Sequence, residues 1–340
     1  MSFVVSAPGR VCLFGDHMDW NWGPVITYAT EEFRNYVQVR PRGDGWIHVR
    51  SHQPYNVEDR FKADGEINYG VGDLDYVRAV LNVLKERGFS LRGMDLEVKT
   101  TIPVGTGLSS SAALCVSTAY AVALLLGSKL TASEAAEIAY TAERKRLGIN
   151  CGQMDPYASA LGSVCYLDCS AEPPKRIERL RMERPLPVLV GDTLTPRKAG
   201  NVLAWLGLRV KEGDPEMLEG VRRIISLVEE AWRMLSKPDW KPEVIGSLMN
   251  RNQRLLREYL RVSTFEIEKL IYASLRAGAY GAKLTGAGGG GCIVALCPEG
   301  DGAKRRVVEA VENAGGKSYL TELASEGVRE EPAEAFNRLT

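Results

Sequence analysis

Hydrophobic and polar residues follow two different periods along the chain, which predicts a mixture of strands and helices. Alternating β-branched runs are typical of strands, whereas apolar residues three or four positions apart are typical of helices that bury one face. In the first half, the strand pattern covers residues 35–41, 46–51, 95–101 and 164–167. Helical spacing begins at Asp73 and continues until Gly88, and a second helical segment covers 131–146. The apolar run 112–126 is typical of a buried helix.

Capping residues indicate where two of the helices begin. Thr131 and Glu134 form a capping-box pattern at the start of the second helical segment. Ser263 and Glu266 repeat the pattern, which predicts a helix over 265–277. We therefore expect both helices to begin abruptly.

The second half of the chain contains longer helical segments and short strand candidates. Asp214 as N-cap and Pro215 at the first helical position predict a helix that extends to Leu235. Further helices are expected at 242–259 and 303–313, and strands at 282–285, 292–297 and 317–321. This order of elements, without an internal repeat, predicts the α+β class. The length of 340 residues suggests two domains, 1–175 and 176–340.

Composition narrows the classes of function. The chain has 43 Lys and Arg against 43 Asp and Glu, so it offers no overall field that would attract nucleic acid or an anionic membrane. Its longest apolar run, 112–126, is shorter than the roughly 20 residues that span a bilayer. Because the first residues lack the features of a secretory signal and the seven cysteines lie mostly in apolar runs, we expect a cytoplasmic protein with reduced thiols.

A glycine- and serine-rich segment carries the clearest chemical signal. Residues 103–113, PVGTGLSSSAA, follow a predicted strand and lead directly into the apolar helix. Glycines allow backbone N–H groups to converge, and a helix N-terminus adds partial positive charge, so this arrangement suits a phosphate group. A plain turn with a serine N-cap is the alternative interpretation. The chain contains no GxxxxGK[ST] sequence, so the segment is not a Walker A loop.

Three motifs in order resemble those of the GHMP kinase superfamily, which includes galactokinase, homoserine kinase, mevalonate kinase and phosphomevalonate kinase. Residues 7–23, APGRVCLFGDHMDWNWG, are similar to the galactokinase signature GRVNLIGEHTDYNGG. Residues 103–112 are similar to PxGxGLSSSA, and 284–292, LTGAGGGGC, to LTGAGFGGC. The resemblance implies an N-terminal domain like domain 2 of ribosomal protein S5 and a ferredoxin-like C-terminal domain, with the active site in the cleft between them.

The same resemblance implies ATP and Mg²⁺ as cofactors and gives roles to individual residues. The phosphates are expected to lie against Pro103, Gly105, Gly107, Leu108, Ser109, Ser110 and Ser111. Ser111 and Glu143 match the Mg²⁺ ligands of the family. Asp155, in the segment CGQMD, matches the carboxylate that receives the proton of the acceptor hydroxyl. Arg10 matches its partner, which would keep that carboxylate ionised and offset charge on the transferred phosphoryl group.

Substrate selection is expected to involve the first and third motifs. The substrate-binding candidates are Asp16, His17, Asp19, Gly152 and Gly288. Paired carboxylates suit a polyol because they accept hydrogen bonds from neighbouring hydroxyls. The resemblance therefore favours a monosaccharide phosphorylated at its anomeric hydroxyl, by an enzyme that acts as a monomer or homodimer.

Two departures from the galactokinase pattern put galactose itself in doubt. Galactokinases carry Glu where this chain has Asp16, which is one methylene shorter. Within 190–200 the pattern of the sugar-contacting segment is incomplete, and an ungapped count places Ala204, beside Trp205, where galactokinases have a tyrosine. The sequence DTLTPR in this segment also resembles mevalonate kinases.

Several alternatives therefore stay open. The substrate class could instead be mevalonate, or a uronic acid, pentose or amino sugar, and a non-catalytic sugar-sensing regulator is the alternative of another class. His17 could be a structural histidine, Glu143 an exposed charge and Asp155 a loop-capping carboxylate. Residues 286–291 also match GxGxxG, but the strand predicted after them excludes a dinucleotide fingerprint, which requires a helix there.

Overall fold

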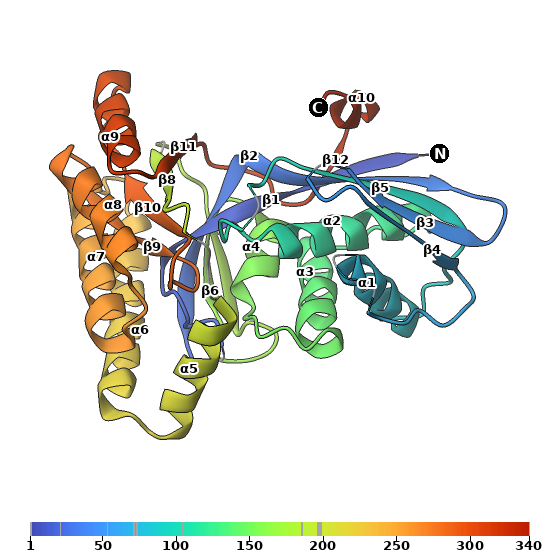
Figure 1. The fold of residues 1–340 in the computed structure, drawn as a ribbon, viewed down its shortest axis with the longest axis horizontal. Helices are drawn as coiled ribbons and strands as arrows, with labels where there is room; N and C mark the ends of the chain where they lie inside the picture. The colour runs from blue at the N-terminus through green and yellow to red at the C-terminus, as the bar shows by residue number, and fades with distance from the viewer. Residues whose placement is uncertain are drawn as a thin grey trace.

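The fold consists of two sheets with helices packed against them (Figure 1). The structure is a computed structural model that describes residues 2–339 except 21, 53, 71, 73, 104, 185 and 196–198. In the described residues the first sheet has the order β12-β1-β2-β5-β3-β4, with β6 paired to β2 and β7 to β6. Its strands are β1 (Phe3–Phe14), β2 (Pro24–Pro41), β3 (Trp46–Ser51), β4 (Val57–Lys62), β5 (Met94–Thr100), β6 (Val164–Asp168), β7 (Arg176–Leu180) and β12 (Arg329–Glu331).

The helices of the first half cover one face of this sheet (Figure 1). They are α1 (Asp75–Glu86), α2 (Ser110–Leu125), α3 (Ala132–Tyr140) with the π-helical turn η1 (Thr141–Arg146), and α4 (Met154–Leu161). α2 is apolar on all sides because it packs against β1 and β2 as well as α1, α3 and α4. The capping box of α3 is present as predicted. Asp73, the expected start of α1, lies outside the described residues.

The second sheet is small and lies beside α7 and α8 (Figure 1). Its order is β11-β8-β10-β9, formed by β8 (Val188–Asp192), β9 (Gly281–Thr285), β10 (Cys292–Leu296) and β11 (Lys317–Thr321). The remaining helices are α5 (Ala199–Lys211), α6 (Pro215–Leu235), α7 (Pro242–Leu255) with η2 (Leu256–Leu260), α8 (Phe265–Arg276), α9 (Asp301–Asn313) and α10 (Ala333–Asn337). The α+β class predicted from the sequence is confirmed.

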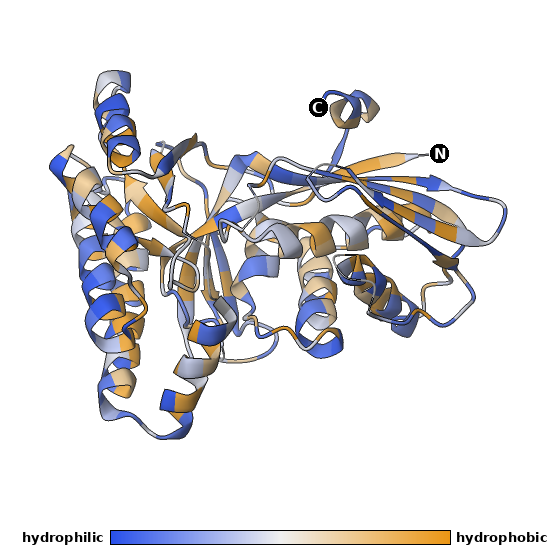
Figure 2. Ribbon diagram, in the orientation of Figure 1, coloured by the Kyte–Doolittle hydropathy of each residue, from blue (hydrophilic) through white to orange (hydrophobic). Residues whose placement is uncertain are grey.

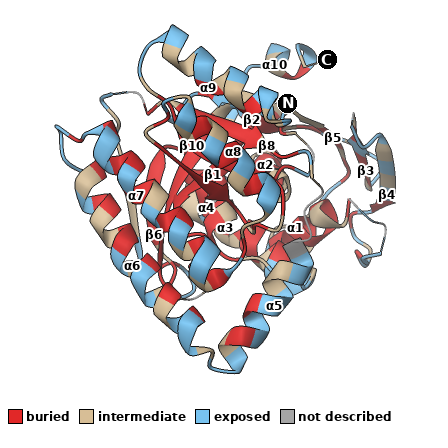
Figure 3. Cartoon of the chain, turned by 60° about the vertical axis from the view of Figure 1, so that its left-hand side comes forward, coloured by how far each residue is buried: buried red, intermediate tan, exposed pale blue. Residues whose placement is uncertain are grey.

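Burial follows the hydropathy pattern in both halves. Figure 2 shows hydrophobic and hydrophilic residues side by side on α6 and α7, and Figure 3 shows β1, β2 and α2 as mostly buried. Asp214 caps α6 as expected, since its carboxylate accepts hydrogen bonds from two backbone N–H groups of the first turn. The N-cap of α8 is a correction, because Thr264 rather than Ser263 accepts the backbone N–H, and Ser263 donates to Glu268 instead.

The change from one sheet to the other falls between β7 and β8. β7 begins at Arg176 and pairs with β6, so the first sheet continues past residue 175, where we expected the first domain to end. The chain also returns to the first sheet at its end, where β12 pairs antiparallel with β1. The second sheet is therefore inserted between two segments that belong to the first. All seven cysteines are free thiols.

Candidate active site

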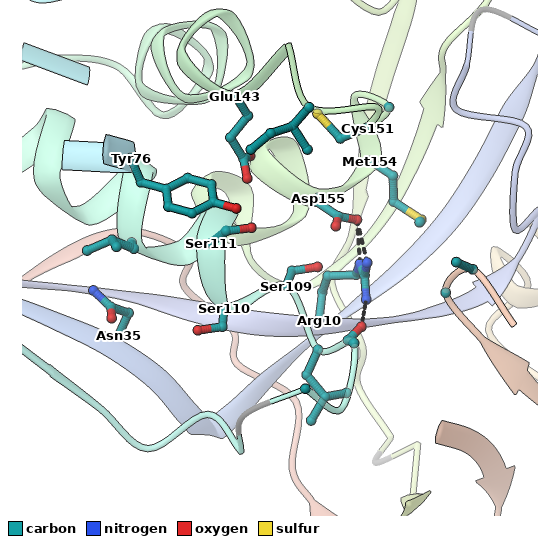
Figure 4. Close-up of a pocket in the computed structure, with 18 of the residues that line it drawn as sticks. Arg10, Asn35, Tyr76, Ser109, Ser110, Ser111, Glu143, Cys151, Met154 and Asp155 are labelled. Atoms are coloured by element: carbon teal, nitrogen blue, oxygen red, sulfur yellow. Dashed lines mark hydrogen bonds and ion pairs between the residues drawn. The ribbon is translucent and has the colours of Figure 1, made fainter. Parts of the chain in front are cut away.

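An ion pair between Arg10 and Asp155 lies at the centre of the site. Arg10 is on β1, and its Nε and Nη2 lie 2.7 and 2.5 Å from Oδ1 of Asp155, in the first turn of α4 (Figure 4). Its third nitrogen, Nη1, donates to the carbonyl oxygen of Gly107 at 2.7 Å. Burial lowers the pKa of the Arg10 guanidinium, but the neighbouring acidic groups, chiefly Asp155, raise it by more. The net result is a raised pKa. Two residues far apart in the sequence thus form one charged unit beside the serine-rich loop.

The serine-rich loop is held against β1 by the backbone. The N–H of Arg10 donates to the carbonyl oxygen of Leu108 at 3.1 Å. A side chain at Gly9 would begin 2.6 Å from that oxygen, so the close approach requires glycine. Ser109, the N-cap of α2, has φ of +64° and a buried hydroxyl without a hydrogen-bond partner among the described residues. A buried polar atom of this kind at a helix N-terminus is suited to an anionic ligand.

Ser111 and Glu143 bring oxygen ligands to the same wall (Figure 4). Glu143 lies in η1 and is 3% exposed, and its carboxylate points toward the Ser111 hydroxyl (Figure 4). Burial raises the Glu143 pKa to about 7, and the nearby Ser111 hydroxyl opposes that rise. Tyr76 of α1 also lines this part of the cavity, and no sequence motif marks it.

This pair of ligands fits a magnesium ion. A carboxylate and a hydroxyl are hard oxygen donors, and Mg²⁺ is usually held by one or two protein groups together with waters and substrate phosphates. The described residues contain no group of three or more His, Cys, Asp or Glu that could hold a metal ion by themselves. Any ion at Ser111 and Glu143 would therefore need ligands from water or from a bound phosphate.

Asp19 lies beside the Arg10–Asp155 pair. Its Oδ2 accepts the N–H of Met154 at 3.3 Å, and its backbone oxygen accepts the N–H of Gln153 at 3.2 Å. A β-carbon at Gly152 would lie 2.1 Å from Oδ2, so glycine is required for this contact. Burial, reinforced by the nearby charge of Asp155, raises the Asp19 pKa to about 7.

His17 adds a neutral hydrogen-bond acceptor to the same end of the cavity. It has φ of +71°, and its ring is hydrogen-bonded to the backbone of Ala287 in the third motif. The other ring nitrogen, Nε2, is buried without a partner among the described residues. Burial lowers the His17 pKa to about 4, so the imidazole is neutral at physiological pH. The His17 and Trp20 rings are nearly perpendicular, with their centroids 6.2 Å apart.

Asp16 and Gly288 do not line the cavity among the described residues, in contrast to the direct substrate contacts that we expected. Asp16 is completely buried, and its Oδ2 forms an ion pair with Nζ of Lys283 at 2.5 Å. Its other oxygen, Oδ1, accepts the N–H of Gly286 at 2.9 Å. Gly288, at φ of +73°, packs against the carbonyl oxygen of Val262. Both residues therefore contact protein rather than the open space.

The cavity has a volume of about 480 Å³ and joins all three motifs. Its lining includes every expected phosphate-binding residue, together with Arg10, His17, Asp19, Ser111, Glu143, Gly152 and Asp155. At the other end it is lined by side chains that carry no motif, namely Asn35, Ser51, Tyr55, Val57, Val98 and Thr100. Gly200 and Leu203 of α5 contribute, whereas Ala204 is exposed. Pro196, Arg197 and Lys198, part of the incomplete sugar-contacting segment, lie outside the described residues.

Comparison with known proteins agrees with this architecture. The N-terminal and C-terminal domain models of the GHMP kinases match residues 75–163 and 241–317, and the galactokinase galactose-binding signature matches residues 1–41. The chain is 36% identical to a mevalonate kinase of Pyrococcus horikoshii over 96% of its length and 97% of the relative's. It is 33% identical to a galactokinase of Chloroflexus aggregans, over 86% of this chain and 83% of that one.

A solved structure has the same fold. The galactokinase of Lactococcus lactis complexed with galactose superposes with a TM-score of 0.83 at 23% identity, covering 96% of this chain and 95% of that one. The protein belongs to the GHMP kinases, which makes it a phosphotransferase that acts on a small molecule. In the part of the chain that the structure describes, no helix is long and apolar enough to cross a membrane.

Proposed function

We propose that the protein transfers the γ-phosphate of ATP to a hydroxyl of a monosaccharide, with the anomeric hydroxyl as acceptor. The observation that carries this proposal is the acceptor-rich end of the cavity, which the side chains of Asp19, Asp155 and His17 line together. A neutral polyol offers several O–H donors to such a site. A substrate carboxylate would instead meet two acidic side chains there.

The triphosphate is assigned to the serine-rich loop. Gly105 and Gly107 adopt φ of +75° and +83°, which allows backbone N–H groups to converge where a side chain would interfere. The N-terminus of α2 supplies partial positive charge, and Ser109 supplies a hydroxyl without a partner among the described residues. Ser111 and Glu143 would hold Mg²⁺, which when bound neutralises charge on the phosphates.

Asp155 and Arg10 are assigned to the transfer itself. Both short contacts of Arg10 are to Oδ1, so Oδ2 is the oxygen that accepts a hydrogen bond from the substrate hydroxyl and receives its proton. Asp155 also orients that hydroxyl, because a carboxylate near neutral pH is a weak base on its own. Arg10 is charged and held on two sides, so it stabilises developing charge without reorganising.

Mevalonate is the second candidate acceptor. It is supported by the 36% identity with a relative that is named a mevalonate kinase, a value slightly above that of the galactokinase. The two candidates differ in charge, since mevalonate carries a carboxylate and a neutral sugar does not. A comparison of turnover with the two acceptors therefore tests directly whether the acceptor-rich end of the cavity prefers a neutral substrate to a carboxylate.

The test is a panel of acceptors with ATP and Mg²⁺, in which ADP release is measured with purified protein. We expect turnover with a neutral monosaccharide and none with the corresponding 1-O-methyl glycoside, whose anomeric oxygen is blocked. Transfer to mevalonate and to no sugar would overturn the sugar assignment. Sugar binding by calorimetry without any turnover would instead support the sugar-sensing regulator, and the Asp155→Asn variant provides the inactive reference.

A further inference from the structure

Asn35 lies at the end of the cavity opposite the acceptor site. It is on β2, where it pairs with Thr100 of β5, and it is 2% exposed. Both residues line the cavity, and Figure 4 shows Asn35 on the far side of the labelled serines from Asp155. No motif marks Asn35. A bound ATP whose γ-phosphate faces Asp155 would extend its nucleoside towards this end.

The side-chain amide of Asn35 is held in one orientation. Its Nδ2 donates to Oγ of Ser117, on α2, at 2.9 Å. The Ser117 hydroxyl has a single proton, and it donates to the carbonyl oxygen of Ala113, one turn earlier, at 2.7 Å. Ser117 can therefore only accept from Asn35, so the NH₂ group of the amide faces Ser117 and the oxygen faces away from it.

The amide oxygen is an acceptor without a partner. Among the described residues, no group donates a hydrogen bond to Oδ1 of Asn35. Oδ1 is also absent from the fully enclosed, unpartnered polar atoms of these residues, so it keeps some accessible surface, and the cavity is the space that Asn35 lines. A largely buried acceptor of this kind is costly to leave unpaired. It is suited to a hydrogen-bond donor on a ligand.

The position of Ser117 along α2 indicates which part of a nucleotide reaches Asn35. Ser110, Leu114 and Ser117 lie three or four residues apart and so share one face of the helix. Ser110 is at the phosphate-binding end, and Ser117 lies about 10 Å further along the helix axis. The ribose is bonded to the phosphates, so a group this far away belongs to the base. Leu114 and Val98 add apolar lining that suits a flat ring.

We infer that Asn35 is a specificity-determining residue for the phosphoryl donor, whose Oδ1 accepts a hydrogen bond from the amino group of adenine. The inference rests on the proposed function, because it requires the triphosphate to bind at the serine-rich loop. Guanine carries a carbonyl oxygen where adenine carries this amino group, so it would set two acceptors against each other. Ser117 maintains the selection, because without it the amide could turn its NH₂ group towards guanine.

The test measures binding of three nucleoside diphosphates by calorimetry in the presence of Mg²⁺. They are ADP, GDP and the diphosphate of unsubstituted purine riboside, which lacks the amino group. We expect the wild type to bind ADP about tenfold more tightly than either of the others. Asn35→Leu should weaken ADP about tenfold and leave the unsubstituted nucleotide unchanged, because the bond is already missing there. Gln38→Leu, on the same strand but outside the cavity lining, is the matched control.

A second variant tests the orientation of the amide with Asn35 still present. Ser117→Ala frees the amide, so we expect the preference for ADP over GDP to fall about tenfold. An unchanged preference in both Asn35→Leu and Ser117→Ala would overturn the inference, as would equal weakening of all three nucleotides or a wild type that binds all three equally. A wild type that binds none of the three would show instead that the proposed function itself is wrong.

Discussion

Asp16 and Lys283 form an ion pair in which neither side chain is exposed to solvent, although 267 positions separate them in the sequence. Nζ of Lys283 also contacts the carbonyl oxygens of Cys12 and Leu284. The pair joins the first motif to β9 of the second sheet. It therefore fixes the turn that carries His17 and Asp19.

Removing one member of this pair should be strongly destabilising. Lys283→Met leaves the Asp16 carboxylate buried and unpaired, and such changes cost about 3–5 kcal/mol of unfolding free energy. Urea unfolding of Lys283→Met and of the double variant Asp16→Asn/Lys283→Met provides the measurement. We expect the double variant to recover much of the loss, because no uncompensated charge remains. A single variant as stable as the wild type would contradict the buried pair.

Asp155→Asn should abolish most of the turnover while leaving binding intact. Asparagine keeps the size of the side chain but cannot receive the proton, and loss of a general base typically lowers kcat by about 10²- to 10⁴-fold. Steady-state kinetics with the accepted sugar give kcat, and calorimetry gives the sugar affinity. Glu258→Gln, an exposed carboxylate on η2, is the control. An unchanged kcat in Asp155→Asn would remove the proposed role.

Asp19 should make the stability of the ligand-free protein depend on pH. Its pKa is raised from 3.8 to about 7 in the folded state, so between these values the folded protein binds more protons than the unfolded chain. Stability from this group is present at low pH and is lost as the pH rises from about 4 towards 7. Asp19→Asn should therefore gain unfolding free energy relative to the wild type over that range. A difference that does not change with pH would contradict the buried, protonated carboxyl.

Gly152→Ala should damage the acceptor end of the cavity. The new β-carbon would lie 2.1 Å from Oδ2 of Asp19 and 2.6 Å from its backbone oxygen, so the first motif must move. We expect the sugar KM to rise by about tenfold or more, since misplacement of a binding group weakens every orientation-dependent step. Gly207→Ala, in α5 with nothing within 4 Å, is the matched control. Equal KM values for both variants would show that Asp19 does not contact the acceptor.

The sequence predicted the parts of the site that lie within motifs. Arg10 and Asp155 could be proposed because they match motifs of the GHMP kinases, and the serine-rich loop because its glycine spacing encodes a local backbone geometry. Lys283 could not, because it sits in an ordinary strand and acquires its role only when another element packs against it. The same reason explains Asp16, which looked like a substrate ligand until Lys283 was placed beside it.

Some elements of the fold were also beyond sequence patterns. β1 was not predicted, because Pro8 and Gly9 interrupt its apolar pattern, and it bulges at this point. Three of the five residues of β7 are charged, so it carries little apolar signal. By contrast, β3 and β11 were predicted to the residue, and in β3 the alternation of apolar and polar residues is regular. Local patterns therefore located elements that pack simply and missed those defined by distant partners.

The pairing of β12 with β1 has a consequence for dissecting the molecule. Ser6 donates to Glu331, and Arg34 donates to the carbonyl oxygen of Gly327, so residues near both ends of the chain close the same edge. A fragment cut after β7 would lose this cover and present the bare backbone of β1 as a template for aggregation. For expression of the first half alone, residues 327–331 should be joined to the end of β7 by a short linker that takes the place of the second sheet.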